Sequence, residues 1–312
     1  MKVIARTADL DRSSWLELRR KGIGGSDAPA VAGVSKWKSS LEVYLEKIGQ
    51  IDKRDETESI YWGERLEEIV AEEFQLRSGK KVRRKRCVCQ SSKNPFMIAN
   101  IDREVVAERA GLECKTTSVF NANNWDLDHV PDDYMLQCQH YMEVMDWDYI
   151  YLAVLIGGQK FRWMRVEKDP DLIGQLVSIE RDFWRRVESK DPPPVDGSKA
   201  ATDILNFLYG DTGEGVIDLP EESHGWVLDY FEFSQEEKMA KEQKDEASNR
   251  LKNLLKDNRE GRIKNFKVIW QPVTTQRLNT SRIKSELPDL YEKYLEESTY
   301  RKFSIKKEES LI

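Results

Sequence analysis

Two acidic residues and a lysine lie close together in the segment NIDREVVAERAGLECKTTS (Asn100–Ser118). Glu113 and Lys115 are two residues apart on an expected strand, so their side chains project from the same face. Asp102 lies on the preceding strand of an expected hairpin, about level with that pair. Carboxylates bind Mg²⁺, and a neighbouring lysine orients a water or stabilises developing negative charge. The pattern fits metal-assisted hydrolysis of a phosphodiester; the alternative is a surface strand with a cross-strand ion pair.

Two further polar residues lie on apolar faces of expected helices. Glu67 is on the core-facing stripe of the helix expected at residues 58–78. A carboxylate there is costly unless it is paired, binds a metal, or lies at the edge of the stripe and reaches solvent. Gln139 shares its face of the helix expected at 132–145 with two methionines. It is therefore either a core glutamine or part of a site.

A Gly-rich turn, GIGGSDA (Gly22–Ala28), follows a short expected helix near the start of the chain. Arg19, in that helix, is suited to hold a phosphate through two hydrogen bonds. Ser26 and nearby backbone N–H groups would complete an anion cradle. The alternative is that the helix and turn are only a connection.

The hydrophobic pattern predicts the elements that position these residues. Helical spacing occurs at 12–21, 40–49, 58–78, 132–145 and 170–189, and in the short stretch AVAGV (Ala30–Val34). Strands are expected at 81–90, 96–106, 111–117, 149–156 and 160–167, the last two joined by a Gly157-Gly158 turn. The N-terminal two-thirds is therefore expected to be an α/β domain.

The composition changes after PPPVDGS (Pro192–Ser198), a stretch typical of a linker. We expect one domain at 1–195 and a mostly helical extension at 196–312 that serves assembly or partner docking. Within the extension, helices are expected at 233–256 and 282–295, and strands at KVIWQPV and YRKFSIK.

Charge is distributed unevenly along the chain. Residues 200–237 hold ten acidic side chains and no Lys or Arg, so the rest of the chain has a net charge of +4 although the whole carries −6. KKVRRKR (Lys80–Arg86) is either a solvated strand or a phosphate-binding segment. No apolar run approaches the ~20 residues that span a bilayer, and four cysteines are too few for a secreted disulfide scaffold. These features predict a cytoplasmic protein with no membrane association.

Several separated motifs occur in an order that resembles a known family. They are Trp15, Arg19, GIGGSDA, Trp62-Gly63, Glu67, Asp102, Glu113-x-Lys115, Gln137-x-Gln139 and Tyr141. Together they resemble the YqaJ-type viral recombinases, which are similar to phage lambda exonuclease. The resemblance covers roughly residues 10–190. It implies a PD-(D/E)xK nuclease fold, in which helices flank a mixed central sheet.

The resemblance also implies a role for each site residue. Metal ligands would be Asp102, Glu113, the backbone carbonyl of Cys114 and, for a second ion or through water, Glu67. Lys115 would act on the nucleophilic water, Gln139 would position that water or the phosphate, and Arg19 and Ser26 would bind a 5′ phosphate. The cofactor would be Mg²⁺, with two ions per site and Mn²⁺ as a substitute.

Members of this family degrade one strand of linear duplex DNA in the 5′→3′ direction. The 3′ overhang that remains is used by a single-strand annealing protein of the RecT or Red-beta type. The resemblance therefore implies a homo-oligomer, a trimer as in the lambda enzyme, encoded by a phage or prophage and active in the bacterial cytoplasm. Ile101 replaces the family's proline, and the segment after Pro192 has no counterpart in the lambda enzyme, which leaves the trimer open.

Two other interpretations use the same fold. A RecB-like nuclease with an iron–sulfur cluster needs four cysteines at cluster spacing, whereas Cys87 and Cys89 alternate on one strand. A DNA-binding recombination scaffold without catalytic activity would have lost the carboxylates, and this chain keeps them. The three histidines have no metal-ligand spacing.

Overall fold

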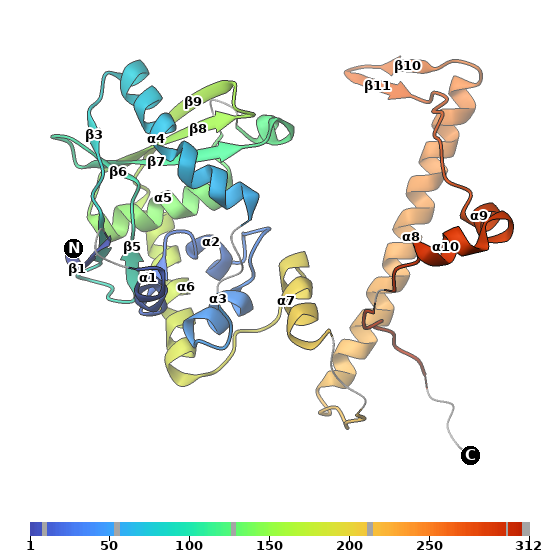
Figure 1. The fold of residues 1–312 in the computed structure, drawn as a ribbon, viewed down its shortest axis with the longest axis horizontal. Helices are drawn as coiled ribbons and strands as arrows, with labels where there is room; N and C mark the ends of the chain where they lie inside the picture. The colour runs from blue at the N-terminus through green and yellow to red at the C-terminus, as the bar shows by residue number, and fades with distance from the viewer. Residues whose placement is uncertain (8–10, 53–56, 126–128, 211–214, 298, 308–312) are drawn as a thin grey trace. The chain divides into compact units, whose positions relative to one another are not determined.

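Figure 1 shows the computed structural model of the chain, which describes residues 1–312 apart from 8–10, 53–56, 126–128, 211–214, 298 and 308–312. The chain divides into two compact units, Met1–Leu208 and Tyr209–Ile312.

A five-stranded mixed sheet forms the centre of the first unit. Its strand order is β3-β6-β7-β8-β9. The strands are β3 (Val82–Arg83), β6 (Arg103–Val105), β7 (Ala110–Thr117), β8 (Tyr149–Ile156) and β9 (Lys160–Glu167). Only β7 and β8 are parallel within this sheet, and helix α5 (Asp132–Met145) lies in the connection between them. A parallel pair requires such a crossover, so the position of α5 follows from the pairing.

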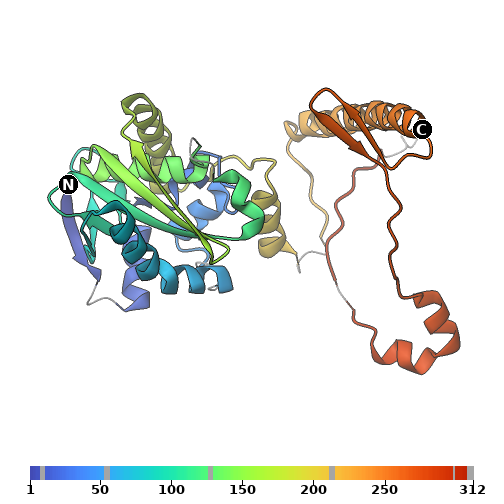
Figure 2. The same ribbon diagram turned by 90° about the horizontal axis from the view of Figure 1, so that it is seen from above.

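Helices cover both faces of this sheet. Val70 and Phe74 of α4 (Glu58–Ser78) pack with Leu112 and other side chains on one face, whereas Met142 of α5 packs with Leu152 on the other. Figure 2 shows the strands between these two helices. Because it is covered on both sides, β8 is apolar along nearly its whole length. The expected mixed sheet flanked by helices is confirmed.

A second sheet has the strand order β1-β4-β5-β2. Its strands are β1 (Lys2–Arg6), β4 (Cys87–Gln90), β5 (Met97–Ala99) and β2 (Ile23–Gly24). The prediction of one continuous strand at 81–90 and another at 96–106 was therefore wrong, because each range forms two strands. The first is divided into β3 and β4 near Arg86, whose φ is +43°, and the second into β5 and β6. In both cases the two halves pair in different sheets.

The remaining helices of the first unit are α1 (Arg12–Arg20), α2 (Ala28–Val31), α3 (Ser40–Lys47), the 3₁₀ helix η2 (Val119–Asn124), α6 (Pro170–Ser189) and α7 (Lys199–Tyr209). A shared core joins Tyr44 of α3, Phe183 of α6 and Ile204 of α7. Because α7 packs in this core, the first unit extends to Leu208, past the division expected at residue 195.

One buried polar pair joins α5 to α6. His140 Nδ1 lies 2.8 Å from Glu180 Oε1, and His140 Nε2 lies 2.9 Å from the carbonyl oxygen of Ile98. Burial lowers the pKa of His140, but the Glu180 carboxylate outweighs burial, so the pKa is raised from its ordinary value. The geometry therefore favours an imidazolium that donates from both ring nitrogens.

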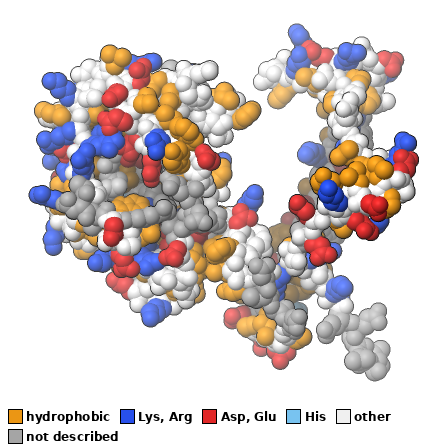
Figure 3. Space-filling model, viewed as in Figure 1, with side chains coloured by type: hydrophobic (Ala, Val, Ile, Leu, Met, Phe, Trp, Pro, Cys, Tyr) orange, Lys and Arg blue, Asp and Glu red, His pale blue; other side chains and the backbone are white. Residues whose placement is uncertain are grey.

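The second unit is mostly helical. It contains α8 (Ser223–Leu255), a hairpin of β10 (Glu260–Ile263) and β11 (Phe266–Ile269), then α9 (Thr280–Glu286) and α10 (Pro288–Lys293). Helix α8 begins ten residues before the expected 233, and the strand expected at YRKFSIK was wrong, since residues 300–307 pair with no strand among those described. Exposed hydrophobic side chains are visible on this unit (Figure 3). No helix in the described ranges is both long and apolar enough to span a bilayer.

Candidate active site

The hairpin of β6 and β7 brings Asp102 beside Glu113. Arg103 pairs with Leu112, so the residue before Arg103 stands opposite the residue after Leu112. Asp102 Oδ2 accepts a hydrogen bond of 2.8 Å from the Cys114 N–H. A strand residue directs its N–H and C=O to the same neighbour, so the Cys114 carbonyl faces the same edge. The predicted position of Asp102 relative to Glu113 agrees with this register.

Glu113 and Lys115 share one face of β7, as their spacing predicts, and α5 covers that face. Lys115 Nζ is 2.6 Å from Glu113 Oε1, and Gln137 Nε2 of α5 donates to the same oxygen at 2.7 Å. Lys115 Nζ also lies 5.1 Å from the centre of the Tyr134 ring. Glu113 is buried, so these donors compensate for the water that its carboxylate has lost.

The electrostatics of this group favour an added cation. Burial raises the pKa of Asp102 well above its ordinary value, and the nearby Glu113 and Glu67 carboxylates raise it further, against the opposite effect of Lys115. Burial lowers the pKa of Lys115, but Glu113 and Asp102 raise it more, so the ammonium form is favoured. The buried Glu113 and the half-buried Asp102 carboxylates repel each other when both are ionised, and a bound cation relieves that repulsion.

The donor set suits a hard divalent ion. Within the described part of the chain, no three His, Cys, Asp or Glu side chains are arranged as a ready-made metal site. Asp102 and Glu113 are two such groups, and Mg²⁺ characteristically binds one or two carboxylates and keeps several waters. These residues therefore fit Mg²⁺ better than Zn²⁺, which takes four ligands, mostly sulfur and nitrogen, in closed sites.

Glu67 is paired with an arginine that the sequence analysis missed. Its carboxylate binds the guanidinium of Arg103, which is buried, and Arg84 Nη2 lies 3.7 Å away. Arg103 also contacts Glu68 at 2.9 Å. A carboxylate on this stripe of α4 was expected to be paired, to bind a metal or to reach solvent, and the structure shows an ion pair. The sequence signal was an arginine directly after Asp102, on a strand with otherwise apolar inward positions.

The prediction for Gln139 needs correction, because the structure places its side chain away from Glu113. Its Nε2 donates to the carbonyl oxygen of Glu167 at 2.8 Å, and its Oε1 accepts from the Asp169 N–H at 3.0 Å. Gln139 thus holds the connection from β9 to α6. Gln137, two residues earlier in α5, is the glutamine that contacts the candidate site.

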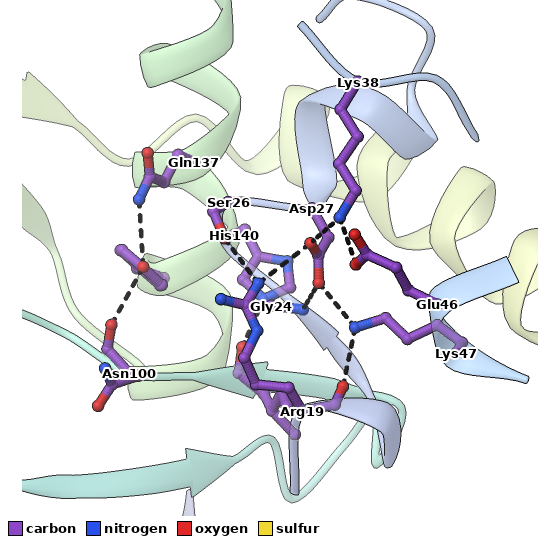
Figure 4. Close-up of polar contacts among 12 residues, drawn as sticks. Arg19, Gly24, Ser26, Asp27, Lys38, Glu46, Lys47, Asn100, Gln137 and His140 are labelled. Carbon is purple, nitrogen blue, oxygen red and sulfur yellow. Dashed lines mark hydrogen bonds and ion pairs between the residues drawn. The ribbon is translucent and has the colours of Figure 1, made fainter. Parts of the chain in front are cut away.

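Tyr141 connects the candidate site to the Gly-rich turn. Its hydroxyl accepts a hydrogen bond of 3.2 Å from Gln137 Nε2 and donates to the carbonyl oxygen of Asn100 at 3.1 Å (Figure 4). The Gly25 backbone lies so close to the ring that an added Cβ would be 2.3 Å from Tyr141 Cε1. Only glycine fits here without a shift. The turn and Glu113 are therefore joined through two side chains, those of Tyr141 and Gln137.

Arg19 and Ser26 lie together, as the sequence predicted. Arg19 Nη2 is 3.0 Å from Ser26 Oγ and 3.2 Å from Asp27 Oδ1, and its guanidinium lies 4.9 Å from the centre of the Trp15 ring. Figure 4 shows Lys38 and Lys47 directed at the same aspartate. These two lysines, which follow the turn in the chain, were not predicted from the sequence.

The basic segment Lys80–Arg86 is largely ion-paired. Lys80 contacts Glu108 at 2.5 Å, Lys85 contacts Glu104 at 2.7 Å, and Arg83 binds the same Glu104. Arg84 contacts Glu68 at 2.7 Å. These contacts favour a solvated, paired segment over a phosphate-binding one.

Comparison with known proteins gives one extensive match. The chain is 40% identical over 310 residues to the uncharacterized protein YqaJ of Bacillus subtilis (strain 168). The aligned region covers 98% of this chain and 97% of that protein. An alkaline exonuclease of Laribacter hongkongensis, LHK-Exo, is 14% identical with a TM-score of 0.48, over 57% of this chain and 94% of its own. A phage-related exonuclease of Haemophilus somnus 129PT is 13% identical with a TM-score of 0.45, over 56% and 99%.

The first of these matches extends over both structural units, whereas the two solved structures resemble only part of the chain. Residues 14–148, which contain Arg19, Asp102, Glu113 and Lys115, match the YqaJ-like viral recombinase domain. The chain belongs to the family defined by that domain.

Proposed function

We propose that this protein is a Mg²⁺-dependent DNA exonuclease. The observation that carries the proposal is the group of side chains on one hairpin, where Asp102 stands beside the buried Glu113 and Lys115 binds Glu113. A purely structural ion pair would not need the second carboxylate, which burial and its neighbours hold in a costly environment. Membership of a viral recombinase family supports a DNA substrate.

Asp102, Glu113 and the Cys114 carbonyl would hold the metal, with Glu67 contributing through water or to a second ion. Mg²⁺, for which Mn²⁺ would substitute, supplies a more acidic water and neutralises charge on the scissile phosphate. Lys115 orients that water and stabilises developing negative charge. Gln137 holds the Glu113 carboxylate in place at 2.7 Å, and Arg103 keeps Glu67 near Asp102.

Arg19 and Ser26 support a preference for 5′ ends. A guanidinium beside a hydroxyl is suited to a terminal phosphate, which carries more charge than the phosphodiesters of the backbone. Binding at that position would set the 5′→3′ direction on linear duplex DNA and leave a 3′ single-stranded overhang. An annealing protein of the RecT or Red-beta type would then use the overhang in recombination by single-strand annealing.

The second unit is proposed to serve assembly or to dock that partner. Its exposed aromatic side chains, among them Trp226 and Phe233 on α8, favour contact with another protein surface. A homo-oligomer, such as a trimer, would keep the enzyme on its substrate through many cleavage steps. The site of action would be the cytoplasm of a bacterial host.

The test is digestion of a 5′-phosphorylated linear duplex with each strand end-labelled in turn, in Mg²⁺ or in EDTA. Asp102→Asn and Glu113→Gln should abolish cleavage and weaken Mg²⁺ binding, whereas Lys115→Met should abolish cleavage and retain the metal. Glu104→Gln is the matched control, since Glu104 lies on the same hairpin but is paired with Lys85. Metal-dependent cleavage by the Asp102 or Glu113 variant at the wild-type rate would overturn the assignment.

A further inference from the structure

Asp27 is a buried aspartate around which three cationic side chains converge. Its side chain is 1% exposed. Oδ1 accepts from Arg19 Nη2 and Lys38 Nζ, both at 3.2 Å, and Oδ2 accepts from Lys47 Nζ at 2.7 Å (Figure 4). The Gly24 N–H adds a fourth donor at 3.2 Å. Burial raises the pKa of Asp27, but Lys47, Lys38 and Arg19 together hold it well below its ordinary value, so the carboxylate stays ionised.

The charges of this group do not cancel. Arg19, Lys38 and Lys47 are positive, whereas Asp27 and Glu46, which binds Lys38 at 2.6 Å, are negative. One positive charge is therefore in excess. Folding places this excess beside a turn of small residues, and a core that needed only structural pairing would balance it. The imbalance is the property expected of a site prepared for an anion.

The three cations differ in how far they reach solvent. The side chains of Arg19 and Lys38 are 21% and 19% exposed, whereas that of Lys47 is 3% exposed. Lys47 also donates to the carbonyl oxygen of Arg19 at 2.8 Å, so it fixes the end of α1. Lys47 is thus the internal counterion of Asp27, and Arg19 and Lys38 are the cations that an incoming ligand can contact.

Arg19 and Lys38 retain donors for such a ligand. Among the described contacts, Arg19 donates its hydrogen bonds from Nη2 alone, and Lys38 uses two of the three donors of its ammonium group. Because both nitrogens lie 3.2 Å from one oxygen, Asp27 Oδ1, they are close enough for a single phosphate to bridge them.

We propose that Lys38 is a second ligand of the 5′-terminal phosphate, and that Asp27 is the resident anion that holds Lys38 and Arg19 in position when no DNA end is bound. This inference rests on the proposed function and extends it. A terminal phosphate monoester carries close to two negative charges, one more than a backbone phosphodiester. Two cations beside one fixed aspartate thus distinguish a DNA end from the interior of a duplex, which Arg19 alone would do less well.

The experiment measures binding in EDTA, where cleavage does not interfere. Three duplexes of one sequence are compared by fluorescence anisotropy, one with a 5′ phosphate, one with a 5′ hydroxyl, and one with a 5′ hydroxyl and a 3′ phosphate. The wild type should prefer the 5′-phosphorylated duplex over both others by roughly ten- to a hundredfold, the range for a charge-assisted hydrogen bond. The 3′-phosphate duplex controls for total charge.

Lys38→Gln keeps a donor for Asp27 and removes the charge, so it should lose most of this preference while its affinity for the 5′-hydroxyl duplex stays the same. Lys38→Arg should retain the preference. Lys36→Met is the matched control, because Lys36 is an exposed lysine of the same loop. A wild-type preference in Lys38→Gln would overturn the inference, and so would equal binding of all three duplexes by the wild type. Nuclease activity in Mg²⁺ is measured separately, so either result leaves the Mg²⁺-dependent cleavage of DNA to its own test.

Discussion

Replacing Gly25 with alanine should displace the Tyr141 ring and, through Gln137, disturb the position of Glu113 in the candidate active site. The added Cβ would lie 2.3 Å from Tyr141 Cε1, and ordinary contact begins at 3.4 Å, so the buried ring must move by about 1 Å. The Tyr141 hydroxyl then leaves hydrogen-bond distance of Gln137 or of the Asn100 carbonyl, which are 3.2 and 3.1 Å away in the native structure. Gln137 in turn holds Glu113.

Two magnitudes follow from this displacement. Overpacking of a closely packed core costs about 1–3 kcal/mol of unfolding free energy, which urea denaturation measures. Misplacement of a catalytic group by about 1 Å costs roughly a hundredfold in rate. We therefore expect Gly25→Ala to remain folded at 25 °C but to cleave linear duplex DNA in Mg²⁺ about a hundredfold more slowly.

Gly24→Ala is the control for this substitution. It is the adjacent residue of the same turn, but its added Cβ would meet Asp27 Oδ2 at 3.5 Å, an ordinary contact. It should retain wild-type stability and most of the activity. If Gly25→Ala cleaves as fast as Gly24→Ala, the connection from the turn through Tyr141 to Glu113 has no catalytic role, and the reasoning is refuted.

Three further outcomes are expected. Gln137→Ala should lower the cleavage rate with little loss of stability, whereas Gln139→Ala should lower the urea midpoint by freeing the start of α6 and leave the cleavage rate per folded molecule unchanged. Because the pKa of His140 is raised in the folded state, its contribution to stability is complete below about pH 6.5, the ordinary His value, and is lost as pH rises through the folded value. Urea titrations should show that decline in the wild type and not in His140→Gln. A chain ending at Leu208 should fold, and one ending at Val195 should be less stable, because it lacks the buried face of α7.

The sequence predicted the long helices well because residues at or next to their ends determine where they begin and stop. Helix α4 ends at Ser78, where the next residue, Gly79, caps it in a left-handed conformation with φ +71°, and α6 begins at Pro170, as the sequence suggested. The strands at 81–90 and 96–106 were harder, because each contributes to two sheets and the division depends on which distant strands pair with it. Local propensity contains no information about those partners.

The site residues show the same distinction. Glu113 and Lys115 were placed on one face because strand alternation is strict, and their contact at 2.6 Å agrees. Gln137 and Gln139 are separated by about 200° around α5, so only the packing of that helix decides which of them meets Glu113. The lysines around Asp27 were missed because each is, in the sequence, an unremarkable surface residue of a loop or a short helix.

The division of residues 96–106 between two sheets has a consequence for folding. Asp102 lies in the short connection between β5, which belongs to the four-stranded sheet, and β6, which belongs to the five-stranded sheet. A ligand that binds only the assembled arrangement stabilises everything needed to assemble it. Metal binding at Asp102 and Glu113 would therefore stabilise the β6–β7 hairpin, and it would oppose any separation of β5 from β6 that moves Asp102.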